Sequence, residues 1–324
     1  MEVAEALYTL LSYNVGGDRQ LKPRWIGFRA ELELGPLLNR RGRVAKTLRG
    51  GVFLPVIKGA SPLDNPVYFT VIGASEDKAD YLELYAAISK IGLKSAYMIV
   101  YEDTRPFADW AMTDIMKCGV SLPVPEFLIF RFDGGRFNLC SEGLKALSDE
   151  FRPARRSGVK TRIAFSEFDW CVIFDHVEAC DLEGLYAERL IFDGLLGFGV
   201  NKGIPADIDN VIVDVDGGIS LVEVKEKDRS KRPPVGFGMD IRRRDDLALL
   251  QQKTGLGVFY IVREVKDQSA REFVGWHIIP LNKYIAATDG SRAIEGGTGM
   301  RSQHSKNPTS VCPIESFHAL KFEV

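Results

Sequence analysis

Apolar side chains in the first 150 residues recur at two different spacings. Residues 28–38 and 78–91 follow the helical period of about 3.6 residues, and Gly92 is suited to end the second helix. The segment FLIFRFDGGRF at 127–137 predicts a hairpin, because Asp-Gly-Gly supplies the positive φ of a tight turn. Short apolar runs predict buried strands at 51–57, 67–72 and 96–101. The first half is therefore expected to be mixed α/β.

The second half has a more regular order of elements. Helices are expected at 182–196 and 240–254, and strands at 208–214, 219–226, 258–265 and 273–281. An Asp-Gly-Gly turn at 216–218 joins the first two strands into a hairpin. Asp240 is a suitable N-cap for the second helix, and Gly255 a suitable end. Residues 233–238 and 288–310 are rich in Pro, Gly, Ser or Asn and are expected to be loops.

A polar, basic segment separates the two halves. Residues 148–162 read SDEFRPARRSGVKTR and are interrupted by Pro153 and Gly158, which is typical of a linker. We therefore expect an N-terminal α/β domain at 1–150, a linker at 151–165 and a second domain at 166–324.

Composition excludes several classes of function. The net charge of −2 gives no global attraction for nucleic acid, so such binding would depend on local patches. Four His and five Cys without a CxxC pair indicate neither a zinc site nor a disulfide framework. Neither an apolar run of roughly 18 residues nor a signal-peptide pattern occurs, so we expect a soluble, cytoplasmic protein without a membrane partner. No P-loop is present, and no nucleotide cofactor is expected.

The strand ISLVEVKEK at 219–227 carries the residues most suggestive of chemistry. Alternate side chains share a face of a strand, so Glu223 and Lys225 point the same way while Val222 and Val224 face the core. Asp209 begins the preceding strand, 14 positions before Glu223, and a tight hairpin can bring the two carboxylates together. Carboxylate oxygens of this kind suit Mg²⁺ or Mn²⁺. The ammonium of Lys225 would lie beside the metal and steady developing charge.

The run IPADIDNVIVDVDGGISLVEVKEKD resembles the signature of the PD-(D/E)xK nuclease superfamily, which has the restriction-endonuclease-like fold. The resemblance covers about 100 residues. It implies an αβββαβ core, a central mixed sheet flanked by helices, here with an additional N-terminal α/β domain. It also implies that Asp209, Glu223 and the helical Glu188 hold the metal, with Lys225 as the fourth catalytic residue. Pro205 precedes Asp207 by two positions and Asp209 by four, so Asp207 stays an alternative to Asp209.

A basic stretch follows the candidate site. Residues 225–244 hold eight Lys or Arg against three acids, and a DNA phosphate backbone is a fitting partner for this local excess. The residues expected to bind DNA are Lys227, Arg229, Lys231, Arg232, Arg242, Arg243 and Arg244. The last three fall in the first turn of a helix, where cations oppose the macrodipole. Pairing with Asp245 and Asp246 is the alternative explanation. Gln251, further along the helix, is a tentative site residue.

Two interpretations of the first half stay open. The segment KIGLKSAYMIV from Lys90 echoes KTGLGVFYIV from Lys253, and Ala30-Glu31 with Leu37-Leu38 loosely echoes Ala187-Glu188 with Leu195-Leu196. In the first interpretation, these echoes make the first half a copy of the nuclease fold. The copy is degenerate, because its strand VYFTVI at 67–72 lacks the acid and the lysine. The alternative is an unrelated recognition or dimerisation domain that grips phosphates through basic stretches such as 39–51.

The leading expectation is a Mg²⁺-dependent DNA endonuclease of restriction or other prokaryotic defence type. Double-strand cutting by two equal sites makes a homodimer the natural assembly. One alternative is a repair or recombination nuclease that acts on branched or damaged DNA. Another is a non-catalytic module that binds nucleic acid or senses a ligand.

Overall fold

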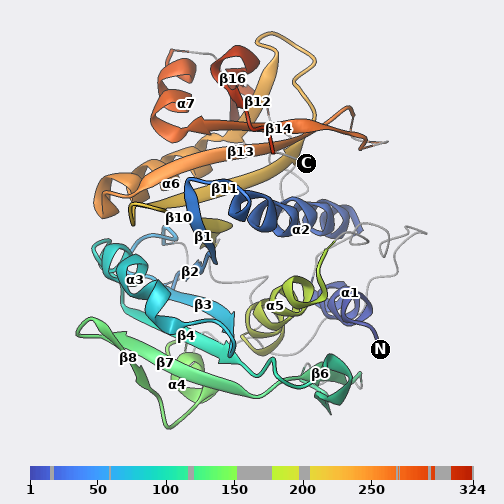
Figure 1. The fold of residues 1–324 in the computed structure, drawn as a ribbon, viewed down its shortest axis with the longest axis vertical. Coiled ribbons are helices and arrows are strands. Elements are labelled where there is room, and N and C mark those ends of the chain that lie inside the picture. The colour runs from blue at the N-terminus through green and yellow to red at the C-terminus, as the bar shows by residue number, and fades with distance from the viewer. Residues whose placement is uncertain are drawn as a thin grey trace. The chain divides into compact units, whose positions relative to one another are not determined.

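The computed structural model describes residues 1–14, 18–57, 60–115, 120–151, 177–196, 205–267, 269, 271–290, 293–295 and 308–322. These residues form α/β structure in which parallel and antiparallel strand pairs occur in the same sheets (Figure 1). The chain divides into two compact units. Unit 1 holds Met1–Trp25 and Arg49–Asp207, and unit 2 holds Ile26–Leu48 and Ile208–Val324. Within the described part, every helix is too short or too polar to cross a membrane.

Unit 2 is built on a six-stranded mixed sheet. Its strands, in order, are β1 (Val44–Arg49), β10 (Asn210–Asp214), β11 (Ile219–Lys227), β13 (Gly257–Val265), β14 (Phe273–Pro280) and β17 (His318–Ala319). β10 and β11 form the expected antiparallel hairpin. β11 and β13 are parallel, and β14 returns antiparallel to β13. The predicted hairpin, helix, strand and strand of the second half are thus confirmed.

Three helices accompany this sheet: α2 (Asp18–Asn39), α6 (Ile241–Thr254) and α7 (Leu281–Thr288). On α2, Ala30, Leu34 and Leu38 lie four residues apart, which puts them on one helix face. They pack with Val222 and Val224 of β11 in a buried cluster. Since alternate residues of β11 face opposite ways, Glu223 and Lys225 lie on the face away from α2.

A second, small sheet of unit 2 was not expected. β12 (Gly236–Asp240), β16 (Pro308–Pro313) and β15 (Ile294–Glu295) lie in that order, where sequence composition predicted loops at 233–238 and 288–310. A Cβ on Gly236 would lie 1.9 Å from the carbonyl oxygen of Cys312. Glycine here permits two strand backbones to approach closely, and the prediction of loops was wrong for these strand residues.

Unit 1 contains the other six-stranded sheet. Its strands, in order, are β8 (Arg136–Leu139), β7 (Phe127–Asp133), β4 (Ser95–Tyr101), β3 (Val67–Gly73), β2 (Val52–Leu54) and β9 (Ala206–Asp207). A two-stranded sheet pairs β5 (Ala111–Thr113) with β6 (Leu122–Val124). The helices of unit 1 are α1 (Val3–Asn14), α3 (Leu82–Ser89), α4 (Leu144–Asp149) and α5 (Ala179–Arg189). β3 and β4 are buried along their whole length, as their apolar runs predict.

The division into units differs from a simple N-terminal and C-terminal pair. The chain passes between units after Trp25, after Leu48 and again after Asp207. Residues 152–176 include nearly all of the predicted linker 151–165 and lie outside the described residues. The predicted domain limits at 150 and 166 therefore do not mark the limits of the compact units.

Candidate active site

The β10–β11 hairpin brings together the carboxylate and the amine that the sequence pairs. Asp209 directly precedes β10, and its Oδ2 accepts a hydrogen bond of 2.6 Å from the backbone N–H of Val224. The same oxygen lies 3.3 Å from Nζ of Lys225. The Asp209 side chain is only 2% exposed, whereas that of Lys225 is 39% exposed. Asp209 is thus fixed to β11 by the backbone, and Lys225 is the more accessible partner.

Glu223 is a buried carboxylate between two cations. Its Oε1 lies 2.8 Å from Nζ of Lys225. Its Oε2 accepts hydrogen bonds from Nε of Arg243, at 2.9 Å, and from Nη2 of the same guanidinium. Burial by itself raises the pKa of this carboxyl, but the charges and hydrogen bonds of Arg243 and Lys225 outweigh it and lower the pKa to about 2. Glu223 is therefore ionised across the physiological range.

Three carboxylates meet at this point of the chain. One oxygen from each of Asp207, Asp209 and Glu223 lies within 4.8 Å of the other two. Hard oxygen atoms at such spacing suit Mg²⁺ or Mn²⁺ better than softer metals. Asp207 is exposed, in contrast to its two neighbours, and remains the alternative ligand that the displaced proline indicates.

The sequence did not reveal that Arg243 contacts Glu223 in this site. Asp240 caps α6 as predicted, since its side chain accepts from the backbone N–H groups of Arg242 and Arg243. This cap directs the first turn of α6 toward β11, where Arg243 reaches Glu223. The signal in the sequence is an arginine placed against the helix dipole, which indicates an anionic partner but does not distinguish a phosphate from the carboxylate of Glu223.

The other basic residues expected to bind DNA fall into two groups. Nζ of Lys227 donates to the carbonyl of Gly238 at 2.8 Å, and burial lowers its pKa to about 8. Arg229 binds the buried Glu264. Arg244 binds Asp245 at 2.8 Å, which is the pairing that the sequence offered as an alternative to phosphate binding. Lys231, Arg232 and Arg242 are exposed, as is Arg229 despite its contact with Glu264. Gln251 is half-buried on α6.

Glu188 belongs to unit 1, whereas Asp209, Glu223 and Lys225 belong to unit 2. It lies on α5, which contacts α1 and β3. Its carboxylate accepts a hydrogen bond of 2.8 Å from Arg189. In unit 2, the helix that covers the sheet beside β11 is α2.

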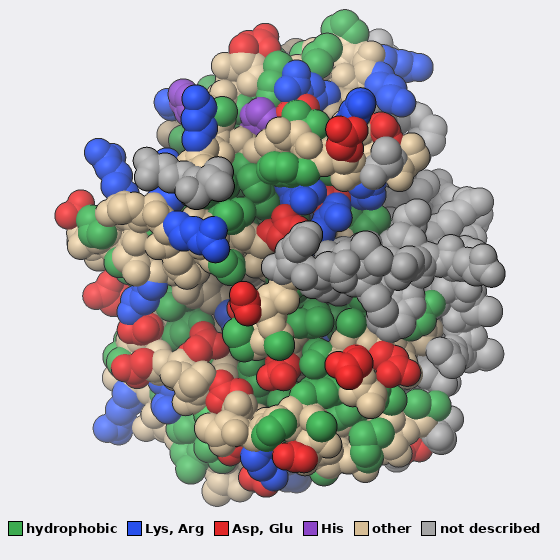
Figure 2. Space-filling view, turned by 45° about the vertical axis from the view of Figure 1, so that its right-hand side comes forward, with side chains coloured by type: hydrophobic (Ala, Val, Ile, Leu, Met, Phe, Trp, Pro, Cys, Tyr) green, Lys and Arg blue, Asp and Glu red, His purple; other side chains and the backbone are tan. Residues whose placement is uncertain are grey.

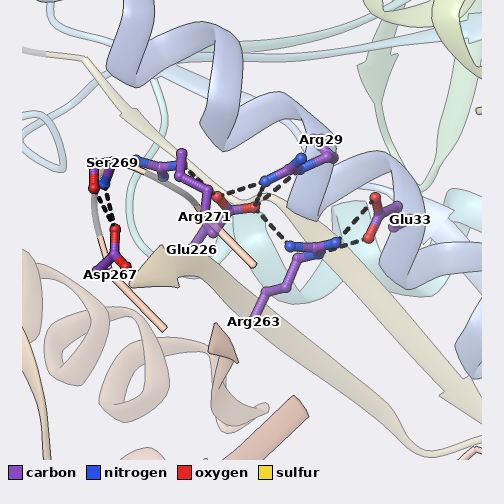
Figure 3. Close-up of polar contacts among 7 residues, drawn as sticks. All are labelled: Arg29, Glu33, Glu226, Arg263, Asp267, Ser269 and Arg271. Carbon is purple, nitrogen blue, oxygen red and sulfur yellow. Dashed lines mark hydrogen bonds and ion pairs between the residues drawn. The ribbon is translucent and has the colours of Figure 1, made fainter. Parts of the chain in front are cut away.

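The opposite face of β11 carries a buried ionic cluster, drawn in Figure 3. The side chain of Glu226 is 1% exposed and accepts hydrogen bonds from Arg29 of α2, from Arg263 of β13 and from Arg271. Arg263 also binds Glu33 of α2 at 2.7 Å. These contacts fasten α2 to β11 and β13. The sequence pattern did not reveal them, because Arg29 and Glu226 are 197 positions apart.

Comparisons with family models, with curated proteins and with solved structures found no match to this chain. The function is therefore argued from the site alone.

Proposed function

We propose that unit 2 is a Mg²⁺-dependent nuclease of the PD-(D/E)xK kind that hydrolyses phosphodiester bonds in DNA. The observation that carries the proposal is the convergence of Asp209, Glu223 and Lys225 on one edge of a hairpin. The elements at the large sheet of unit 2 support it, because their order α2, β1, β10, β11, α6, β13 follows the αβββαβ order expected of the restriction-endonuclease-like core once β12, which belongs to the small sheet, is set aside.

The donor set fits a divalent cation. Asp209 and Glu223 have nearly buried side-chain carboxylates with oxygens within 4.8 Å of each other, and each carboxylate lies beside a cationic group. A cation held there would polarise a phosphate and lower the pKa of a bound water. A cation that used Oε2 of Glu223 would take the place of Arg243 there, and the released guanidinium would be available to an anion. Mn²⁺ is expected to substitute for Mg²⁺.

Lys225 has the position expected of a group that handles the reacting atoms. Its Nζ lies between Asp209 and Glu223, and its side chain is the most exposed of the three. Two carboxylates already orient this ammonium, so no further free energy is needed to orient it when a water or phosphate oxygen binds. It then donates to that oxygen and stabilises the charge that develops.

Charge balance favours a polyanionic substrate. The two buried carboxylates are already balanced by Lys225 and Arg243, so a divalent cation creates a local positive excess that a phosphate offsets. Unit 2 holds 22 Lys or Arg against 18 Asp or Glu, although the whole chain carries −2. Lys and Arg side chains recur on the face of unit 2 drawn in Figure 2. The exposed Lys231, Arg232 and Arg242 are the proposed backbone contacts.

Within this class, we propose a restriction or other prokaryotic defence endonuclease that acts as a homodimer. The second candidate is a repair or recombination nuclease. Comparing plasmid DNA with junction, flap and single-stranded substrates separates the two. The third candidate is a non-catalytic module, in which Lys225 and Arg243 would serve only to balance the buried carboxylates and no metal would bind.

The test is plasmid cleavage in Mg²⁺ or Mn²⁺, with EDTA as the metal-free control. We expect the wild type to cut, and Glu223→Gln and Lys225→Ala to cut at least about 100-fold more slowly. Glu272→Gln is a matched control, since Glu272 pairs only at the surface with Lys266. Undiminished cutting by Glu223→Gln, or no cutting of any DNA by the wild type, contradicts the proposal.

A further inference from the structure

The guanidinium of Arg243 lies where a bound cation would contact Glu223. Its Nε donates to Oε2 of Glu223 at 2.9 Å, and its Nη2 reaches the same oxygen. Lys225 lies 2.8 Å from the other carboxylate oxygen, so both oxygens of Glu223 face a cation of the chain itself. A divalent cation at Glu223 therefore competes with at least one of these two ion pairs.

Of the two internal cations, Arg243 is the one that a metal would displace. The ammonium of Lys225 lies 3.3 Å from Asp209 and 2.8 Å from Glu223, so it stays paired if one contact is lost. Arg243 reaches Glu223 from a separate element, the first turn of α6. Its long side chain can turn away without any change in the β10–β11 hairpin.

The surroundings of Arg243 make an unpaired guanidinium unfavourable. Its side chain is only 16% exposed, and its sequence neighbours Arg242 and Arg244 belong to the same helix turn. Their charges and the positive end of the helix dipole raise the electrostatic free energy of an unpaired cation at this place. Once displaced from Glu223, Arg243 is therefore expected to take another anionic partner.

Asp246 and a substrate phosphate are two anions that can replace Glu223 as this partner. Asp246 lies three positions after Arg243 on α6, so the two side chains lie on neighbouring turns of one helix face. A phosphate oxygen can be contacted by a guanidinium through two N–H groups at once. Asp246 is present with or without DNA, whereas the phosphate is present only with substrate. The two partners therefore predict different effects of DNA on the site.

We propose that Arg243 couples the binding of the divalent cation to the binding of DNA: it holds Glu223 in the metal-free site and transfers to a DNA phosphate when a metal binds. This coupling rests on the proposed function, which supplies the metal and the phosphate. Its consequence is that cation and DNA strengthen the binding of each other by the same factor. Without DNA, metal binding is weak, because Arg243 then loses one anion and gains none.

Exposed cations around the start of α6 favour a phosphate over Asp246. Arg242 is exposed in the same helix turn, and Lys231 and Arg232 are exposed in the segment that precedes β12. Such side chains attract a polyanion and hold its backbone in place. The phosphates of that backbone offset the charge of several cations at once, whereas Asp246 offers a single carboxylate.

The first measurement is Mn²⁺ binding to metal-free, full-length protein by calorimetry, without DNA. Arg243→Gln removes the competing cation and should bind Mn²⁺ about 10-fold more tightly than the wild type. Arg243→Lys keeps the charge but lacks the guanidinium fork, and should fall between the two. Arg244→Gln is the matched control, since it removes a charge from the same turn that pairs with Asp245, and should stay within about twofold of the wild type. A merely structural Arg243 would not tighten Mn²⁺ binding when removed.

The second measurement repeats the titration with a short DNA duplex whose phosphorothioate linkages resist cleavage. In the wild type, the duplex should strengthen Mn²⁺ binding by about 10- to 100-fold. Part of this factor persists in any variant, because a phosphate can also ligate the metal directly. In Arg243→Gln the factor should therefore fall by about 10-fold without vanishing. Asp246→Asn should keep the wild-type factor.

Two results overturn the coupling. One is a duplex that leaves Mn²⁺ binding of the wild type unchanged, which requires no variant. The other is an Arg243→Gln variant that binds Mn²⁺ no more tightly than Arg244→Gln. In both cases, plasmid cleavage by the wild type would leave the proposed nuclease function intact. A wild type that neither binds Mn²⁺ beside the duplex nor cuts DNA contradicts the proposed function itself, and the coupling with it.

Discussion

Glu223 is an ionised side chain with 1% of its surface exposed, and its neighbours explain how the fold tolerates it. Lys225 supplies a charge from the same strand, and Arg243 supplies a second from the first turn of α6. The free-energy cost of burying the carboxylate is offset by these two partners. The same arrangement keeps the carboxylate of Glu223 negatively charged although it is buried, which is the property that a metal ligand needs.

The low pKa of Glu223 predicts how stability depends on pH in metal-free protein. Because the folded-state pKa lies below the ordinary value of 4.5, its contribution is complete above about pH 4.5 and is lost as the pH falls toward 2. Glu223→Gln, which leaves two cations opposite a neutral amide, should reduce the free energy of unfolding by about 3–5 kcal/mol at pH 7.

Urea unfolding at pH 7, 4 and 3 in EDTA measures this effect. The difference between wild type and Glu223→Gln should shrink steadily as the pH is lowered. A difference that stays constant with pH would show that the Glu223 charge does not contribute as described.

At the residue scale, much of the site could be predicted from the sequence. Strand alternation places Glu223 with Lys225, and the short hairpin brings Asp209 beside them. Arg243 could not be paired with Glu223 in advance, because a helix N-terminus can direct an arginine either to a nearby strand or to solvent. Its neighbour Arg244 contacts Asp245 instead.

At the element scale, signals such as helix caps and glycine stops predicted the helices and strands that depend on residues close in sequence. α6 begins after the Asp240 cap and ends at Gly255, as expected. β12 and β16 were missed because each depends on a partner about 70 positions away. In β12, the glycines that suggested a loop allow its backbone to approach that of β16 closely.

The end of α6 makes a prediction about glycine. Gly255 has φ 76°, and a Cβ there would meet no atom within 4 Å, so the effect of an added methyl is conformational alone. Gly255→Ala should lower the free energy of unfolding by about 1–2 kcal/mol. Gly42→Ala is the matched control, because Gly42 is exposed, has space for a Cβ and lacks a left-handed φ. Equal stability of both variants in urea unfolding would contradict this account.

At the scale of the whole molecule, the sequence indicated two α/β portions and a faint repeat but not how the chain is shared between units. Unit 2 takes Ile26–Leu48 from the first half of the chain, and unit 1 extends to Asp207, so that it takes α5 and β9 from the second half. The composition of a linker shows where a chain is polar, but it does not show which sheet each strand belongs to. This division follows from strand pairing over long sequence distances, which local periodicity does not record.

The central claim is that Asp209 and Glu223 share a divalent cation. Crystals soaked in Mn²⁺, with anomalous differences recorded near the manganese edge, test it most directly. The account predicts one strong peak at about 2.0–2.6 Å from oxygens of both carboxylates, with Arg243 displaced from Glu223. Full Mn²⁺ exposure that leaves no peak, with Arg243 and Lys225 still paired to Glu223, would contradict it.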